Sequence, residues 1–371
     1  MTATPDLSAT REDRIPSLDG LRALGIVLVL ISHLLDSGGA APWLAPLWHV
    51  HPGFLGVRTF FVLSGYLITT LLIREATRTG TVNLRRFYLR RALRIMPAYY
   101  AFLLALGVAT VLGAVAIPAS SFVSAATYTS NYFATVYPVG HSWSLAVEEQ
   151  FYILWPGALA ALGLRRGFRL AAAVLVIGPV CRVAALQLGN AWPNNPTFSF
   201  ECVADALATG CLLARYRDRL ATLGWYRALS GKLGGAVWPA VVVVLAWTNV
   251  SHPMFAAAIG ITLINFFIAG AVDWCMRNPA GLVGRVLNAR PVVYVGVLSY
   301  AIYLVQQPFL QEGTRLSPIA SLSLVAAAAL LLHYLVELPG MAYRRRLESR
   351  RRLSVDRARS TTPKQLGVHH R

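Results

Sequence analysis

Arg22 and His33 are the polar side chains best able to do chemistry in the first apolar stretch of the sequence, LDGLRALGIVLVLISHLL at Leu18–Leu35. They stand eleven positions apart, which is roughly three helical turns, so both lie on one helix face about 17 Å apart. Ionisable groups inside a membrane helix are costly and usually face a bundle interior or a wet cavity. The alternative interpretation is structural: Arg22 extends its charged group to the membrane interface, and His33 is a core histidine whose hydrogen bonds are satisfied. For the pair on one face we favour a functional role, with His33 as a general base.

Two adjacent carboxylates stand at or just inside the outer interface of the fourth apolar stretch, in GHSWSLAVEEQFYILWP. Glu148 and Glu149 follow Trp143 and Ser144 there. Paired carboxylates at an apolar boundary can exchange protons in catalysis. They could instead stabilise the start of a helix, where negative charge is favoured, and Trp143 could be an interfacial anchor. Both interpretations stay open on the residues alone.

A basic cluster follows the second apolar stretch, in NLRRFYLRRALRIMPAYY. Arg90, Arg91 and Arg94 fall within five residues, and the last two are spaced i, i+3 on a helix. Guanidinium groups suit bidentate binding of phosphate. The alternative is topology alone, because cytoplasmic loops of membrane proteins are basic.

The second and ninth apolar stretches contain further polar side chains. Arg58 in GFLGVRTFFVLSGYL needs a partner, and we expect Glu148 or Glu149 to be that partner; Ser64 can form a hydrogen bond across helices. In SYAIYLVQQP, polar side chains suggest a pocket or interhelical hydrogen bonds. The candidate pocket residues there are Tyr300, Tyr303 and Gln306.

Composition places these residues in a membrane protein. The chain has 371 residues, 56% of them hydrophobic and 13% charged, whereas soluble proteins are about 25% charged. The net charge of +18 could indicate nucleic-acid binding, but the arginines lie in loops between apolar segments, so we predict no nucleic-acid partner. The four cysteines form no CxxC and no Cys/His cluster, so we predict no disulfide framework and no metal site.

Ten stretches are candidates to cross the membrane, which predicts an all-α bundle of about ten transmembrane helices. With a cytoplasmic N-terminus, 30 of the 34 Lys and Arg residues fall in cytoplasmic segments, so we expect both termini in the cytoplasm. Residues 120–134 are interpreted as a re-entrant or interfacial piece. The candidate spans are 18–35, 54–73, 95–117, 145–163, 170–188, 198–215, 235–249, 254–273, 291–310 and 318–337.

Six motifs in order resemble the acyltransferase-3 family of integral-membrane O-acyltransferases. They are LDGLRALGIVLVLISH, GVRTFFVLSGYLI, FYLRRALRIMPAYY, HSWSLAVEEQFYILWP, LSYAIYLVQQP and VELP, and the resemblance covers about residues 14–340. It implies transfer of an acyl group, commonly acetyl, from cytoplasmic acyl-CoA to a hydroxyl. The implied acceptors are surface glycans such as peptidoglycan, exported sugars, or macrolide-type metabolites.

The resemblance also implies roles for individual residues. Arg22 and His33 match the family's Arg-then-His pair, Arg91 and Arg94 its RxxR element, and Glu148 its membrane glutamate. Many members have His where this chain has Gln306. We therefore predict His33, Arg22 and Glu148 as catalytic; Arg90, Arg91 and Arg94 as the site for acyl-CoA phosphates; and Arg58, Ser64, Trp143, Ser144, Tyr300, Tyr303 and Gln306 as pocket residues.

These assignments predict an acyl-CoA-dependent enzyme of a bacterial inner (plasma) membrane, with no permanently bound cofactor. Its partners are acetyl-CoA or another acyl-CoA, a hydroxyl-bearing acceptor and the lipid bilayer. Residues 1–17 form a cytoplasmic segment, 18–340 the transmembrane acyltransferase domain and 341–371 a basic cytoplasmic tail. The rivals are a proton-coupled secondary transporter, which buried Arg, His and Glu would suit, and a non-catalytic membrane partner. A covalent acyl-histidine route is also open.

Overall fold

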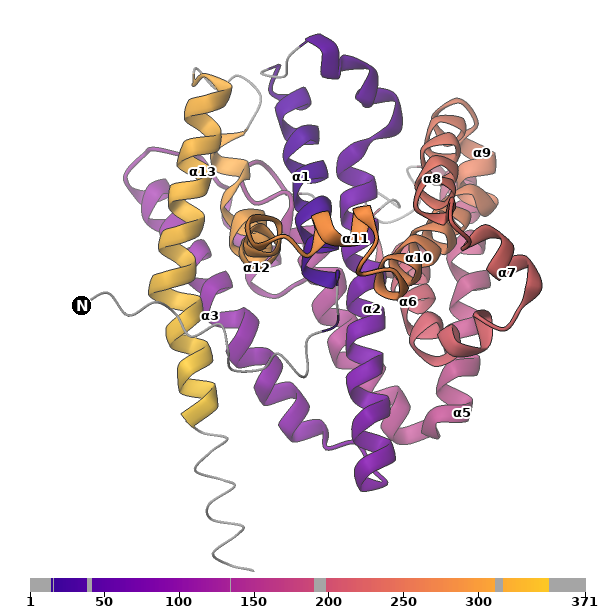
Figure 1. The fold of residues 1–371 in the computed structure, drawn as a ribbon. Coiled ribbons are helices and arrows are strands. Elements are labelled where there is room, and N and C mark those ends of the chain that lie inside the picture. The colour runs from indigo at the N-terminus through magenta and orange to yellow at the C-terminus, as the bar shows by residue number, and fades with distance from the viewer. Residues whose placement is uncertain are drawn as a thin grey trace, which may run out of the picture.

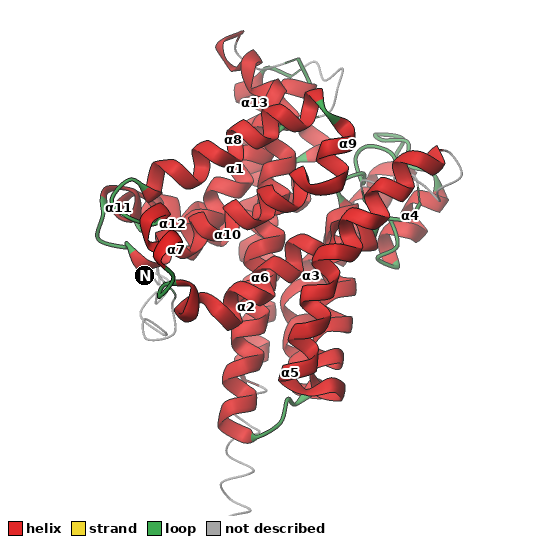
Figure 2. Cartoon of the chain, turned by 90° about the vertical axis from the view of Figure 1, so that its right-hand side faces the viewer, coloured by secondary structure: helices red, strands yellow, loops and turns green. Residues whose placement is uncertain are grey.

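The computed structural model describes residue 15 and residues 17–38, 42–133, 135–189, 198–310 and 316–346. Within these ranges every regular element is a helix, which confirms the all-α prediction (Figure 2). The elements are α1 (Leu18–Asp36), η2 (Pro42–Val50), α2 (Pro52–Thr79), α3 (Leu84–Val111), α4 (Ala119–Ala126), α5 (Ser142–Leu188), α6 (Phe200–Leu220), α7 (Gly224–Leu229), α8 (Gly234–Ser251), α9 (Pro253–Phe255), η4 (Ala256–Gly260), α10 (Ile261–Arg277), α11 (Leu282–Leu287), α12 (Arg290–Val305), η5 (Gln307–Phe309), α13 (Pro318–Leu332) and η6 (His333–Glu337).

Seven of the described helices are long and apolar enough to cross a membrane. They are Leu18–Asp36, Pro52–Thr79, Leu84–Val111, Ser142–Leu188, Gly234–Ser251, Pro253–Arg277 and Pro318–Arg346. The length and apolar composition of these helices indicate a multi-pass membrane protein. The ten spans and the cytoplasmic termini stay predictions, and most of the predicted basic tail, residues 347–371, lies outside the described residues.

Two details of the helices agree with the sequence pattern. The 47-residue α5 is broken by non-helical dihedral angles at Gly163, between the spans predicted at 145–163 and 170–188. The positive φ of 72° at this position is one that glycine adopts without a steric penalty. Within the predicted interfacial piece, α4 has only eight residues, too few to cross the hydrocarbon core.

The bundle is arranged around α1 and α2, which pack side by side in the middle of Figure 1. Helix α12 lies against α1 and α13 against α12, whereas α6 packs on the other side of α2 and is covered by α5 and α10. The end of α2 extends past the other helices in Figure 1. This order brings one face of α1 and one face of α2 to the centre of the bundle.

Glycines set the close approach of α2 and α6. A Cβ atom on Gly65 would overlap the backbone of Leu207, and one on Gly210 would overlap the backbone of Val62. Small residues at such contacts let helix backbones meet within a membrane, where packing rather than hydrophobicity drives association. The contact fixes the register of α6 along α2.

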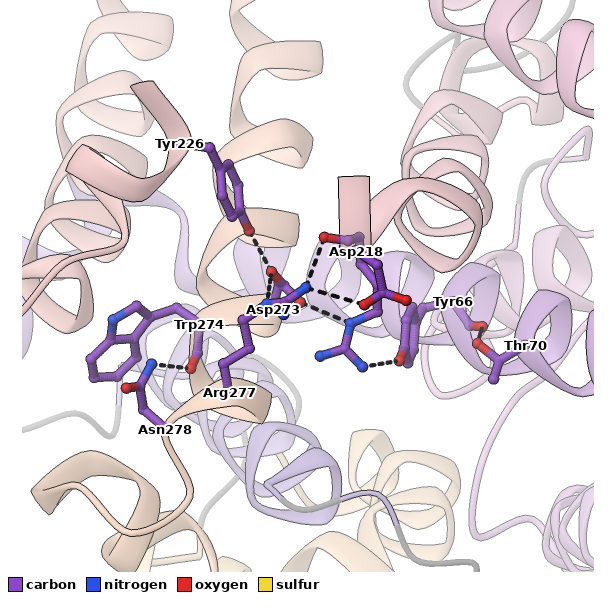
Figure 3. A network of polar contacts seen from close by, with 9 residues as sticks. Tyr66, Thr70, Asp218, Tyr226, Asp273, Trp274, Arg277 and Asn278 are labelled. Atoms are coloured by element: carbon purple, nitrogen blue, oxygen red, sulfur yellow. Dashed lines mark hydrogen bonds and ion pairs between the residues drawn. The ribbon is translucent and has the colours of Figure 1, made fainter. Parts of the chain in front are cut away.

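A buried carboxylate ties α6, α7 and α10 together, as Figure 3 shows. Asp273 accepts hydrogen bonds from Tyr226 Oη at 2.6 Å, Arg217 Nε at 3.0 Å and Arg277 Nε at 2.8 Å. Arg217 also donates to the hydroxyl of Tyr66 on α2. Each charge in the cluster has a partner of opposite sign, which fits a structural tie.

Candidate active site

Three adjoining cavities run through the bundle centre in a row. The arginine cavity, of about 160 Å³, is lined by Arg22, Arg91, Arg94, Glu148 and Glu149 among others. A neck of about 70 Å³ shares Arg22, Leu145, Glu148, Ser299 and Tyr300 with it. The histidine cavity, of about 780 Å³, contains His33 and shares Val57 and Tyr303 with the neck. Shared walls therefore link the Arg22 end of α1 to its His33 end.

The arginine cavity brings together cations from two helices. Arg91 and Arg94 are one turn apart on α3, so they share a helix face, and they line this cavity together with Arg22 of α1. The Arg91 guanidinium lies 3.7 Å from the centre of the Tyr152 ring, and its Nε is buried without a hydrogen-bond partner among the described residues. Arg90 lines none of the three cavities.

Glu148 lies inside the bundle. It sits almost two turns into α5 and lines both the arginine cavity and the neck. Its carboxylate accepts hydrogen bonds from Ser64 Oγ at 2.9 Å and from Tyr152 Oη at 3.0 Å. The two hydroxyls fix the carboxylate beside the arginines.

Tyr303 separates the neck from the histidine cavity. Its hydroxyl lies 2.5 Å from Ser144 Oγ and 3.3 Å from the carbonyl oxygen of His141. Tyr300, one turn earlier on α12, lines the neck and donates to the carbonyl oxygen of Ile95 at 3.0 Å. The predicted pocket residues Ser144, Tyr300 and Tyr303 therefore meet at the narrowest of the three cavities.

The histidine cavity receives His33 from α1 and Trp143 from the start of α5. The His33 Nδ1 lies 3.3 Å from Tyr137 Oη and 3.7 Å from a carboxylate oxygen of Asp36. Trp143 stacks on Phe198 with ring centres 4.4 Å apart. Both residues line the cavity.

Arg58 does not pair with Glu148 or Glu149, so that prediction is wrong. Its Nη1 donates to Asp205 Oδ1 at 3.0 Å. The close contact of α2 with α6 places Asp205 beside Arg58, whereas Ser64, which holds Glu148, lies six residues further along α2, about 9 Å away along the axis. Arg58 nevertheless lines the histidine cavity.

Gln306 lines none of the three cavities, whereas Gln307 lines the histidine cavity. The Gln306 side chain is fully buried, and both its amide atoms lack a partner among the described residues. Consecutive residues on a helix point about 100° apart, so only one of the two amides can face a given cavity. The sequence gives two adjacent glutamines with no basis for choosing between them.

His141 and Gln307 form a contact that sequence reasoning missed. The Oε1 of Gln307 lies 3.1 Å from the backbone nitrogen of His141 and 2.8 Å from its Nδ1. Because the backbone N–H can only donate, Oε1 is the acceptor, and Nδ1 must carry a proton to donate to it. Gly140–Ser144 precede Glu148 and Glu149 in the sequence. Only the fold shows which polar residue of this segment contacts the end of α12.

The environment of His141 predicts a pH-dependent stability. Burial lowers the pKa of His141 to about 4 from its ordinary 6.5. As the pH falls, the His141 side chain is therefore protonated in the unfolded chain before it is protonated in the folded protein. About 3 kcal/mol of folding stability that is present above pH 6.5 is lost between pH 6.5 and 4. We expect the thermal midpoint of His141→Gln to fall less steeply between pH 8 and 4.5 than that of the wild type.

The two proteins share every other histidine, so the difference between their slopes reports His141 together with its electrostatic effect on His33. The measurement is thermal unfolding in detergent, followed by intrinsic fluorescence. Identical slopes would contradict a depressed pKa at this position.

The fold and the cavities define a helical membrane protein with a row of adjoining cavities in its bundle, into which ionisable side chains project. A sequence profile of the acyltransferase-3 family, described as an acyltransferase domain, matches residues 15–338. The chain belongs to this family, which confirms the resemblance of the six motifs.

Curated relatives of the chain carry O-acetyltransferase names. The chain is 29% identical over 330 residues to "Putative peptidoglycan O-acetyltransferase YrhL" of Bacillus subtilis (strain 168), covering 83% of this chain and 50% of the relative. It is 26% identical over 330 residues to peptidoglycan O-acetyltransferase OatA of Listeria monocytogenes, covering 81% of this chain and 50% of the relative. The chain thus spans about half the length of these relatives. No solved structure matches the chain.

Proposed function

We propose that the protein is a membrane O-acyltransferase that moves an acyl group, in the first instance acetyl, from acyl-CoA to a hydroxyl of a glycan in a bacterial plasma membrane. The observation that carries this proposal is the row of cavities with shared walls, with three arginines at one end and His33 at the other. Membership of the acyltransferase-3 family and the O-acetyltransferase names of its relatives support the reaction class.

The arginine cavity is the proposed donor end. Arg22, Arg91 and Arg94 converge there from α1 and α3. Guanidinium groups form charge-assisted, bidentate hydrogen bonds with phosphate oxygens, and the unpartnered Nε of Arg91 is a donor that such an anion would satisfy. Acyl-CoA would present its phosphates here, and its long flexible arm would carry the thioester through the neck.

The histidine cavity is the proposed acceptor end. Its volume of about 780 Å³ is in the range of pockets that enclose small molecules. Its wall combines the stacked Trp143 and Phe198 rings with polar side chains such as Asn131 and Gln307. Aromatic faces beside amide groups suit a sugar ring, which has apolar faces and polar edges.

The proposed reaction uses His33 as a general base. Its imidazole takes the proton of the acceptor hydroxyl while the hydroxyl oxygen attacks the thioester carbonyl. The tetrahedral intermediate collapses by breaking the carbon–sulfur bond, and the CoA thiolate recovers the proton from His33. Tyr303, which lies on the wall between the neck and this cavity, is placed to hydrogen-bond the carbonyl oxygen. Glu148 would orient Arg22 and the arginine cluster from the neck.

The test is transfer by the purified protein. We expect folded protein in detergent to release the thiol of radiolabelled acetyl-CoA and to place the label on added glycan strands. A transporter or a non-catalytic partner would leave the thioester intact. Absence of both thiol release and label transfer in folded protein, with peptidoglycan fragments and simple glycosides as acceptors, would contradict the proposal.

A further inference from the structure

Within the part of the chain that the structure describes, the wall of the histidine cavity contains one permanently charged side chain and no carboxylate. One arginine, Arg58, and three histidines, His33, His51 and His141, line it. None of the described residues that line it is Asp or Glu. Asp36 lies 3.7 Å from His33 but is not part of the wall.

Arg58 belongs to a buried network with an excess of one cation. Asp205 is fully buried and lies between Arg58 and Arg182, at 3.0 Å from a nitrogen of each. Two arginines around one carboxylate leave a net charge of +1 in the protein interior. A buried charge without compensation is costly, so a binding anion would be favoured at this position.

The uncompensated charge lies on the cavity side of the network. Arg182 is satisfied, because it donates to the carbonyl oxygens of Ala257 and Cys202, to Asp205 and to Thr262. Asp205 Oδ2 also accepts from the Thr262 hydroxyl, so both its oxygens are occupied. Among the described residues Arg58 has one hydrogen-bond partner, although a guanidinium has five N–H groups.

The position of Arg58 is fixed even though it donates a single hydrogen bond to the described residues. Its side chain is only 3% exposed, and its guanidinium carbon lies 5.0 Å from the centre of the Phe54 ring. Stacking of this kind holds the planar group in place. The same cavity wall contains Ser130 Oγ and the side-chain amide of Asn249, buried polar atoms without a partner among the described residues.

We propose that Arg58 binds a negatively charged group of the acceptor, a carboxylate or a phosphate, and thereby selects anionic hydroxyl-bearing acceptors over neutral ones. This inference rests on the proposed function, since it takes the histidine cavity as the acceptor site. Ser130 and Asn249 offer hydrogen bonds to hydroxyls next to the charged group. Arg58 is then a specificity-determining residue, separate from the base His33.

The test measures binding of three sugars to the full-length protein by calorimetry at constant ionic strength. The neutral probe is the methyl β-glycoside of N-acetylglucosamine. The methyl β-glycoside of N-acetylmuramic acid adds a carboxylate, and N-acetylglucosamine 1-phosphate adds a phosphate. All three have a free hydroxyl at C6. We expect the wild type to bind at least one charged sugar about 10- to 100-fold more tightly than the neutral one. Whichever of the two charged sugars binds more tightly shows whether the site recognises a carboxylate or a phosphate.

The decisive variant is Arg58→Gln. It removes the hydrogen bond from Arg58 to Asp205 Oδ1, whereas Oδ2 keeps those from Arg182 and Thr262, and the buried network becomes neutral. We expect it to abolish the preference for the charged sugar while binding of the neutral sugar changes little. The matched control is Arg217→Gln, which removes one of two arginines from the buried Asp273 outside the cavity and should keep the preference.

Two results would overturn the proposal. One is a wild type that binds neutral and charged sugars equally or binds none of them; the other is an Arg58→Gln variant that keeps the preference. If Arg58→Gln does not fold, Arg58→Lys keeps the charge but loses the bidentate fork, and it should keep only part of the preference. Sugar binding needs no acyl-CoA, so a failure of acyl transfer and a failure of anion selection are observed separately.

Discussion

Replacing His33 with alanine lowers the turnover of acyl transfer by about 10²- to 10⁴-fold, the usual contribution of a general base. His33 projects from α1 into the histidine cavity, and its nearest polar groups, Tyr137 Oη and the Asp36 carboxylate, lie at 3.3 and 3.7 Å. These long contacts contribute little to packing, so the variant should fold. The initial rate of thiol release from acetyl-CoA in the presence of acceptor measures the effect.

Donor binding provides the internal control for His33→Ala. The arginine cavity lies about 17 Å away along α1, so affinity for acetyl-CoA should change less than threefold. His252→Ala removes an exposed histidine that lines none of the cavities and should keep wild-type turnover. Normal product formation by His33→Ala would contradict its role as the base and would direct attention to His141, which shares the cavity.

Sequence reasoning succeeds where a single helix decides the geometry. Arg22 and His33 line one row of cavities because three helical turns separate them, and Arg91 and Arg94 meet because they are one turn apart. Both relations follow from the period of the helix, whatever its neighbours do. The all-helical fold follows in the same way from the apolar stretches.

The relations that failed depend on how different helices are aligned. Arg58 pairs with Asp205 because Gly65 and Gly210 let α2 and α6 approach and fix their register, and no spacing along the chain contains that information. The contact of His141 with Gln307 joins residues 166 positions apart. It could have been found only by knowing which face of α12 meets the start of α5.

Replacing Arg91 and Arg94 together with alanine weakens the binding of acetyl-CoA by about 10²- to 10⁴-fold. Each guanidinium is expected to make hydrogen bonds to a phosphate, and bonds to charged groups are worth about 1.5–3 kcal/mol each, so two add to roughly 3–6 kcal/mol. Calorimetric titration with acetyl-CoA in detergent measures the change. Turnover at saturating donor should change much less, because His33 and the acceptor cavity are untouched.

The matched control for this variant is Arg85→Ala/Arg86→Ala. These two arginines are exposed on the first turn of the same helix and line none of the three cavities. The two substitutions remove the same net charge as those at Arg91 and Arg94. They therefore report any general attraction of the anionic donor to a basic surface, an attraction that salt screens. A loss in the Arg91/Arg94 variant alone assigns the phosphates to the arginine cavity. Equal losses in both variants would show that charge near the membrane surface, and not the convergence of Arg22, Arg91 and Arg94, binds the donor.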